Sequence, residues 1–118
     1  MSLKAEAVET VADVPETSSF DLLEDESAAF ATSRMIQAME IAAARLMRRR
    51  LAAGQSSVGI EMNLTYASTS ALRARSTSGP VRAVAEYLGV AGRLHRFSIN
   101  AFDESGLVGS CEHARSVV

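Results

Sequence analysis

The sequence has few cysteines and few aromatic residues, and these shortages limit both its chemistry and its core. Among 118 residues there is one cysteine, Cys111, and aromatic residues make up 5% of the chain, with no tryptophan. A disulfide within the chain and a cysteine-rich metal site are therefore excluded, and a single thiol suits a reducing compartment. We interpret Cys111 as a small buried strand residue rather than a nucleophile. The core must be built mainly from Ala, Val, Leu, Ile and Met.

Long apolar runs and a basic excess are also missing. No run of about 18 apolar residues occurs, and the N-terminus lacks the basic and then apolar pattern of a signal peptide. The net charge of −2 argues against general nucleic-acid binding. The Arg48–Arg50 run is expected to complement a helix dipole rather than to bind nucleic acid. We therefore expect a cytoplasmic protein with no membrane or nucleic-acid partner.

Familiar catalytic and metal-binding motifs do not occur in the chain. It has no Gly-rich phosphate loop, no Gly-x-Ser-x-Gly and no paired His or Cys at metal-ligand spacing. We expect no metal and no cofactor. His95 and His113 fall on different predicted strands, and each is interpreted as a strand-surface or core-edge residue rather than a catalyst.

One long amphipathic segment dominates what is present. At about 100° per residue, Ile36, Met39 and Leu46 share one face of a helix that begins near Phe30. The spacing predicts a central helix within residues 28–54, which Gly54 terminates. Its far side carries arginines, so one face is expected to be buried.

Two polar residues fall on this apolar face. Glu40 and Thr32 lie about 40° to either side of Ile36, so both are predicted to point into the core. A buried carboxylate needs a partner, and Glu40 is either a base in a cleft or the structural partner of an arginine. Thr32 or Ser33 is predicted to cap the first helical turn. Thr32 could also join free helix N–H groups in binding an oxyanion.

The remaining segments alternate in polarity as strands do. Residues 1–27 hold one strand and an acidic connector, and residues 57–118 hold four strands in an antiparallel meander. Residues 67–79, rich in Ser and Thr, form the longest predicted loop. This order predicts one α+β domain over residues 1–118, a hot-dog fold whose single antiparallel sheet of about five strands wraps one long helix. The predicted strands are Ala5–Val14, Val58–Tyr66, Val81–Val90, Leu94–Phe102 and Leu107–Val117.

Three segments carry a resemblance to a known family. Residues 30–40 (FATSRMIQAME), 57–66 (SVGIEMNLTY) and 109–115 (GSCEHAR) resemble the marked segments of the fluoroacetyl-CoA thioesterase-like branch of the hot-dog thioesterases. The resemblance covers roughly residues 28–118. It implies hydrolysis of an acyl-CoA thioester, with CoA as part of the substrate and no separate cofactor.

The resemblance also assigns residues to roles. In that family a Thr and a Glu of the helix work with a His at the end of the next strand, which implies catalytic roles for Thr32 and Glu40. Tyr66 stands in place of the His. A phenol is a poor base at neutral pH, but it can donate a hydrogen bond to a carbonyl. The substrate-binding residues expected beside them, with the arginines on the CoA phosphates, are Gly59, Phe30, Arg115, Arg73 and Arg75.

Two alternatives to a hydrolase stay open at this point. The first is a non-catalytic hot-dog module that binds acyl-CoA or another small apolar ligand, and the second, weaker one is an acyl thioester dehydratase. In either case a sheet of this size leaves an edge and a face exposed. We therefore expect a homodimer, or a tetramer, with the cleft between protomers.

Overall fold

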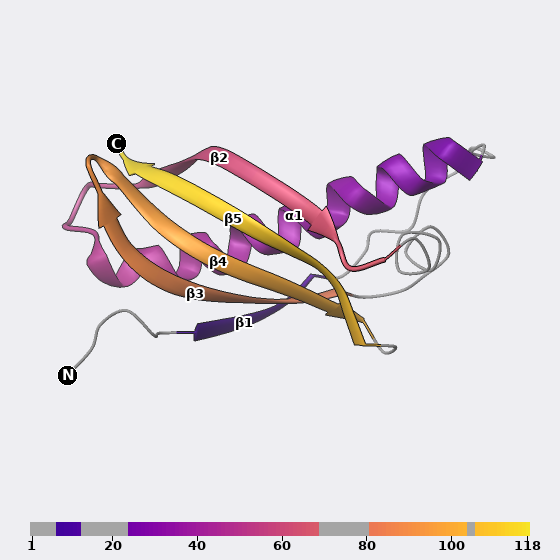
Figure 1. Ribbon diagram of the computed structural model, residues 1–118. Coiled ribbons are helices and arrows are strands. Elements are labelled where there is room, and N and C mark those ends of the chain that lie inside the picture. The colour runs from indigo at the N-terminus through magenta and orange to yellow at the C-terminus, as the bar shows by residue number, and fades with distance from the viewer. Residues whose placement is uncertain (1–6, 13–23, 69–80, 104–105) are drawn as a thin grey trace.

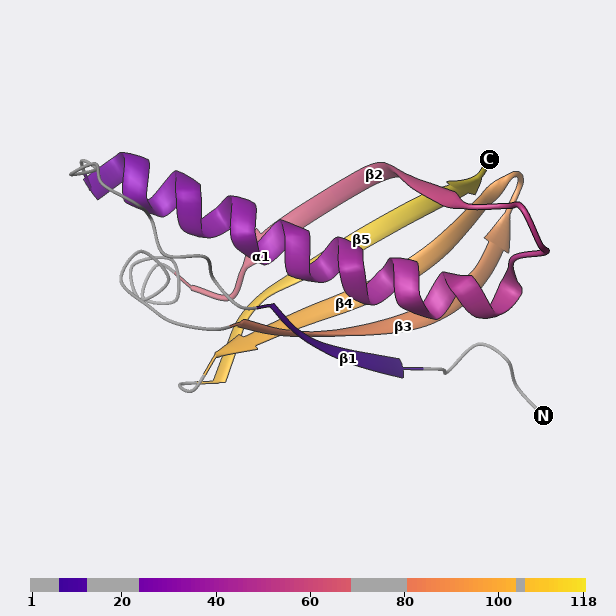
Figure 2. The same ribbon diagram turned by 180° about the vertical axis from the view of Figure 1, so that it is seen from behind.

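A computed structural model of the chain describes residues 7–12, 24–68, 81–103 and 106–118. One helix lies across one face of a five-stranded antiparallel sheet, whose strand order is β1-β3-β4-β5-β2 (Figures 1 and 2). The predicted α+β class and hot-dog arrangement are confirmed. The elements are β1 (Ala7–Ala12), α1 (Glu24–Met47), the 3-10 helix η1 (Arg48–Arg50), β2 (Ser57–Tyr66), β3 (Val81–Ala91), β4 (Leu94–Asp103) and β5 (Gly106–Val117).

The core lies between α1 and the helix-facing side of the sheet. Met35, Met39 and Leu46 of α1 are fully buried, as their helical spacing predicts. Opposite them, Phe97 and Ile99 of β4 are the largest fully buried side chains of the sheet. Small residues, Ala83, Ala85 and Ala101, stand at other buried positions of the sheet, which lets the helix lie close to the strands there. Among the described residues, no helix has the length and apolar character needed to span a membrane.

The helix begins earlier than the sequence predicts. α1 starts at Glu24, about two turns before Thr32. Thr32 is therefore inside the helix and does not cap it, so the expectation that it works beside free helix N–H groups is wrong. Residues 24–26 form the start of this helix. At the other end α1 stops at Met47, and the chain is already extended at Leu51, before Gly54.

A β-bulge interrupts β2 beside the helix. The pairing of β2 with β5 shifts between Gly59 and Glu61, which leaves Ile60 as the extra residue. Such a bulge reverses the alternation of faces. Gly59 consequently faces α1, while Val58 is 43% and Ile60 56% exposed. Simple alternation would put Val58 and Ile60 on the face of Met62, but only Met62 packs against the core.

The other strands lie within a few residues of their predicted positions. The β3–β4 hairpin turns at Gly92, whose φ of 65° suits a glycine. Most of the predicted loop at residues 67–79, and the acidic connector up to residue 23, fall outside the described residues. Cys111 is buried on β5, as expected for a small strand residue.

Candidate active site

A cleft of about 240 Å³ lies where the middle of α1 faces β2 and β5. It combines an apolar wall with a carboxylate and an imidazole. Two of the residues singled out from the sequence, Glu40 and Gly59, are part of it. Its lining residues are Ile36, Glu40, Gly59, Ile60, Glu61, Met62, Leu64 and His113.

Glu40 stands at the rim of this cleft. The prediction that its side chain is buried in the core is wrong, because the carboxylate is exposed in the single chain. Residues at the edge of an apolar helix face reach water in this way when the sheet does not cover them. Water can therefore reach Glu40 while the apolar residue Ile36 stays next to it in the cleft.

Gly59 leaves a hollow on which three side chains converge. A Cβ placed on Gly59 would lie 3.0 Å from Glu40 Oε2, 3.0 Å from His113 Cε1 and 3.6 Å from Arg115 Nη1. These groups come from α1 and β5, and β2 supplies the glycine. The hollow exists because residue 59 has no side chain, so its predicted place beside a substrate pocket has a steric reason.

Thr32 and Tyr66 also meet, although they are distant in the sequence. Thr32 Oγ1 and the Tyr66 hydroxyl share a hydrogen bond of 2.5 Å in which either oxygen can be the donor. Tyr66 reaches α1 because it ends β2 on the helix-facing side. On α1, Thr32 and Glu40 are about 80° apart around the helix axis, on either side of Ile36. The three predicted catalytic residues therefore lie on one side of the helix, but Thr32 is about 12 Å along the axis from Glu40, and neither Thr32 nor Tyr66 lines the cleft.

His113 is a buried residue of the site that sequence reasoning assigned to a strand surface. It is 2% exposed. Its Nδ1 lies 2.9 Å from the Glu61 carbonyl oxygen, and its Nε2 lies 3.1 Å from Arg115 Nη1. A guanidinium only donates, so Nε2 accepts and the proton is on Nδ1. Burial lowers the pKa of His113, which favours this neutral form.

Arg115 is held by protein groups rather than turned to solvent. It is 5% exposed, its Nε donates to Ser57 Oγ at 2.9 Å, and its Nη2 donates to the Ser57 carbonyl at 3.0 Å. The expectation that it binds CoA phosphates is therefore wrong, because a guanidinium buried in this way does not reach a ligand's charged rim. Burial lowers the pKa of Arg115, and attraction to Glu40 opposes that effect. The other two predicted arginines, Arg73 and Arg75, and the side chain of Phe30 lie outside the described part of the structure.

One signal in the sequence could have identified His113. Cys111, His113 and Arg115 are spaced by two, so they share one face of β5. Cys111 is expected to be buried, and Arg115 is expected to belong to the site. A histidine between a buried cysteine and a site arginine is itself directed toward the helix. The parity of the strand could not be fixed from the sequence because glycine and serine precede the cysteine.

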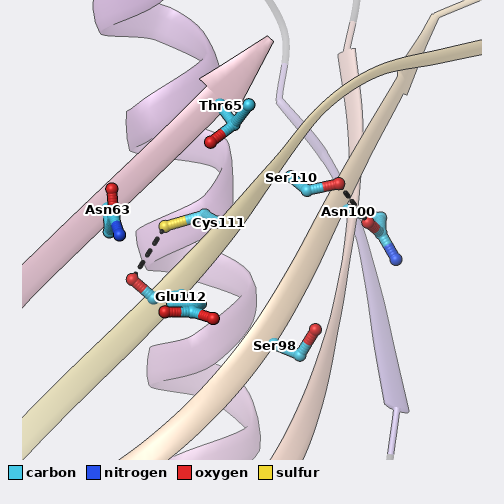
Figure 3. A pocket seen from close by; sticks show the side chains of 7 residues that line it. All are labelled: Asn63, Thr65, Ser98, Asn100, Ser110, Cys111 and Glu112. Carbon is cyan, nitrogen blue, oxygen red and sulfur yellow. Dashed lines mark hydrogen bonds between the residues drawn. The ribbon is translucent and has the colours of Figure 1, made fainter. Parts of the chain in front are cut away.

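A second hollow, of about 320 Å³, lies on the sheet surface away from α1 (Figure 3). Ser110 Oγ donates to Asn100 Oδ1 at 2.7 Å, and Cys111 Sγ donates to the Glu112 carbonyl at 3.3 Å. Burial raises the pKa of the Cys111 thiol, which makes it a poor nucleophile. Polar side chains of this kind suit a sheet face that meets water. The lining residues are Asn63, Thr65, Ser98, Asn100, Ser110, Cys111 and Glu112.

The family profile of the fluoroacetyl-CoA-specific thioesterases matches residues 13–118. The chain belongs to this family. Crystal structures of the fluoroacetyl-CoA thioesterase FlK are 27% identical to it, and one of them covers 98% of this chain and 87% of its own, with a TM-score of 0.70. A point mutant of FlK in complex with fluoroacetate and CoA has the same identity and TM-score, with coverages of 98% and 94%. The resemblance carried by the three sequence segments is confirmed.

More distant structures share the fold. A hypothetical protein of Thermus thermophilus, described as a thioesterase superfamily member, is 17% identical, with coverages of 98% and 82% and a TM-score of 0.72. A hot-dog-like protein from Thermanaerovibrio acidaminovorans is also 17% identical, with coverages of 98% and 83% and a TM-score of 0.70. None of the curated proteins matches the chain. Across the described ranges, no cluster of three or more His, Cys, Asp or Glu side chains is arranged to hold a metal ion.

Proposed function

We propose that the protein hydrolyses an acyl-CoA thioester in the cleft at Gly59. The observation that carries this proposal is the position of Glu40, a carboxylate open to water at the rim of a cleft that is otherwise largely apolar. In the reaction the C–S bond of the thioester breaks, water supplies OH to the acyl carbon, and the products are a carboxylic acid and free CoA thiol. Membership of a thioesterase family supports the same reaction.

Glu40 activates the nucleophile in this proposal. It either removes a proton from the attacking water or attacks the thioester carbonyl itself and is then released by water. Both routes need the acyl carbon to lie within about 3–3.5 Å of the attacking oxygen. Gly59 and Glu40 both line the cleft of about 240 Å³, which offers the acyl group a place beside the carboxylate.

The family's roles assign the hydrogen bond to the thioester oxygen to the Thr32–Tyr66 pair, which stands outside the lining of the cleft at Gly59. As the carbonyl becomes an oxyanion, a donor aimed at that oxygen stabilises it more than it stabilises the substrate. Either hydroxyl can donate within the pair, and when Thr32 donates, the Tyr66 hydroxyl proton can point to a ligand. Tyr66 therefore acts as a donor, in the place where the family's histidine would act.

The cleft favours an uncharged acyl group. Ile36, Met62 and Leu64 contribute apolar surface to it. Burying a charged acyl end against them would cost several kcal/mol, on the order of that for any unpaired buried charge. FlK binds CoA with fluoroacetate in its complex, and we propose an acyl-CoA for this chain, with Arg73 and Arg75 near the CoA phosphates.

A second copy of the chain completes the cleft in this proposal. In the described residues β2 pairs with β5 only, so its other edge is open, and Val58 and Ile60 expose apolar surface beside it. An open apolar edge strand invites pairing with another chain. We propose a homodimer that joins along β2, because a dimer is the smaller of the two expected assemblies. We also propose that the protein works in the cytoplasm, since a single free thiol suits a reducing compartment.

The test is release of free CoA from a panel of acyl-CoAs, followed with a thiol-detecting reagent. We expect turnover for the wild type and a loss of about 10²-fold or more in kcat for Glu40→Gln. Glu40 is exposed, so this isosteric change should leave the melting temperature near that of the wild type. Tyr66→His, which restores the family's residue, is expected to raise the rate.

The same panel decides between an enzyme and a binding module. The absence of the family's histidine favours the module, so acyl-CoA binding is measured alongside turnover. Tight binding without release of CoA would identify a non-catalytic protein. Equal turnover in the wild type and in Glu40→Gln would show that the carboxylate takes no part in the reaction.

A further inference from the structure

The hydrogen bonds of His113 form a chain that runs from β2 to Arg115, whose Nη1 stands near Glu40 at Gly59. The Glu61 carbonyl accepts from His113 Nδ1, His113 Nε2 accepts from Arg115 Nη1, and Nη1 borders the hollow into which Glu40 Oε2 projects. Each link has one possible direction, because the carbonyl only accepts and the guanidinium only donates. The imidazole therefore holds Nη1, the guanidinium nitrogen beside Gly59, while Ser57 holds Nε and Nη2.

The described bonds do not use all the donors of Arg115. Its guanidinium has five N–H bonds, of which one on Nε, one on Nη2 and one on Nη1 are donated to Ser57 and His113. A second N–H remains on Nη1 at the edge of the hollow. A fixed cation in that position attracts the Glu40 carboxylate and limits its rotamers, which is worth most where water is partly excluded.

We propose that His113 is a positioning residue of the hydrolytic site, which holds Arg115 so that its guanidinium orients the Glu40 carboxylate across the hollow at Gly59. This inference rests on the proposed function. His113 does not contact the substrate in this arrangement. It acts through Arg115, and its neutral Nδ1–H form is required, since a protonated ring would direct an N–H at the guanidinium instead of a lone pair.

Two substitutions separate the two hydrogen bonds of the imidazole. The amide of a glutamine can place an acceptor near the Nε2 position and so keep the bond from Arg115. The amide of an asparagine can place a donor near the Nδ1 position and so keep only the bond to Glu61. We expect His113→Gln to stay within a few-fold of the wild-type kcat, and His113→Asn to lose about 10–100-fold in kcat with little change in KM.

The control is His95→Gln. His95 accepts or donates at Tyr87 rather than at Arg115, and it is the other histidine of the chain. The substitution His95→Gln should leave kcat and KM at their wild-type values. If the role of His113 were only to fasten β5 to β2, His113→Asn would have a higher kcat than His113→Gln. That order of rates would overturn the proposal.

A readout without turnover keeps this inference separate from the proposed function. In 15N-labelled protein, the wild type and His113→Gln should show a protected Arg115 Nε–H resonance, and His113→Asn should show faster exchange of that proton. Identical exchange in all three proteins would overturn the positioning role even if the enzyme is active. If the wild type releases no CoA but the exchange rates differ as expected, the proposed hydrolase activity is wrong and the hydrogen bonds of His113 still position Arg115.

If His113→Asn does not fold, Arg115→Lys takes its place in the experiment. The same loss of kcat is expected, and a wild-type kcat in that variant would contradict the proposal.

Discussion

At the scale of single residues, the site depends on what Gly59 lacks. A methyl group there would meet Glu40 Oε2 and His113 Cε1 at 3.0 Å, and both atoms belong to side chains. Glu40 can turn away into water at little cost, whereas the His113 ring, held by two hydrogen bonds, must shift by a few tenths of an ångström. We therefore expect Gly59→Ala to keep a melting temperature within a few degrees of the wild type, while kcat falls by at least about tenfold because the carboxylate is displaced.

Gly109→Ala is the matched control for that prediction. Its added methyl group would meet the Thr65 carbonyl oxygen at 3.0 Å, and a backbone atom cannot move aside as a side chain can. We expect a loss of about 1–3 kcal/mol in the free energy of unfolding, measured by urea denaturation. A larger loss of stability in Gly59→Ala than in Gly109→Ala would contradict this account of the hollow.

His113 also predicts how stability depends on pH. Burial lowers its pKa in the folded state below the value of about 6.5 that an unfolded chain has. Between the two values the unfolded chain binds more protons, so the free energy of unfolding should fall as the pH drops below about 6.5. Urea denaturation of the wild type and His113→Gln at pH 8, 6.5 and 5 measures this. The variant should lose less stability on acidification, and equal losses would show that His113 does not contribute.

At the scale of elements, the sequence predicts the helix and the strands better than their faces and ends. The spacing of Met39 and Leu46 identifies the buried side of α1, because apolar residues at a 3.6-residue period are typical of a helix with one buried face. The start of the helix is missed since residues 24–27 are polar and resemble a connector. The bulge at Ile60 is missed for a different reason. It turns Val58 and Ile60 outward although both are apolar, and alternation alone cannot show an extra residue.

The candidate site is accordingly only partly predictable. The apolar helix face and the resemblance point to Glu40 and Thr32, and the resemblance alone points to Tyr66. The contact between Thr32 and Tyr66 is not predictable from one sequence, because it joins residues whose elements meet only in the folded chain. Tertiary contacts of this kind also hide His113, whose partners lie on β2 and on its own strand.

The end of the helix is fastened to the sheet through Tyr87. The Arg50 guanidinium of η1 lies 3.6 Å from the centre of the Tyr87 ring, and the Tyr87 hydroxyl lies 2.8 Å from His95 Nδ1. We expect Tyr87→Phe, which keeps the ring, to cost about 0.5–1.5 kcal/mol in the free energy of unfolding. Tyr87→Leu should cost more, since the stacked cation also loses its ring. If Tyr87→Phe and Tyr87→Leu lose the same free energy of unfolding in urea denaturation, the contact with Arg50 does not contribute to stability.

At the scale of the whole molecule, the two faces of the sheet differ in polarity. The helix covers one face, and the other carries the hydroxyl and amide groups around Ser110 and Asn100 that can meet water (Figure 3). The remaining exposed apolar surface near the cleft is at the β2 edge, which directs the expected assembly to that edge rather than to the sheet face.

Two residues of equal exposure test that assembly. Val58 on β2 and Leu88 on β3 are each 43% exposed, but β2 has an open edge whereas β3 lies between β1 and β4. We expect light scattering to give about twice 12.6 kDa for the wild type and for Leu88→Lys. Val58→Lys should give the monomer mass, because a lysine on each paired edge sets like charges against each other, and its rate of CoA release should fall with the loss of the shared cleft. A wild-type protein that is monomeric at micromolar concentration, or a Val58→Lys monomer with undiminished kcat, would place the complete site within one chain.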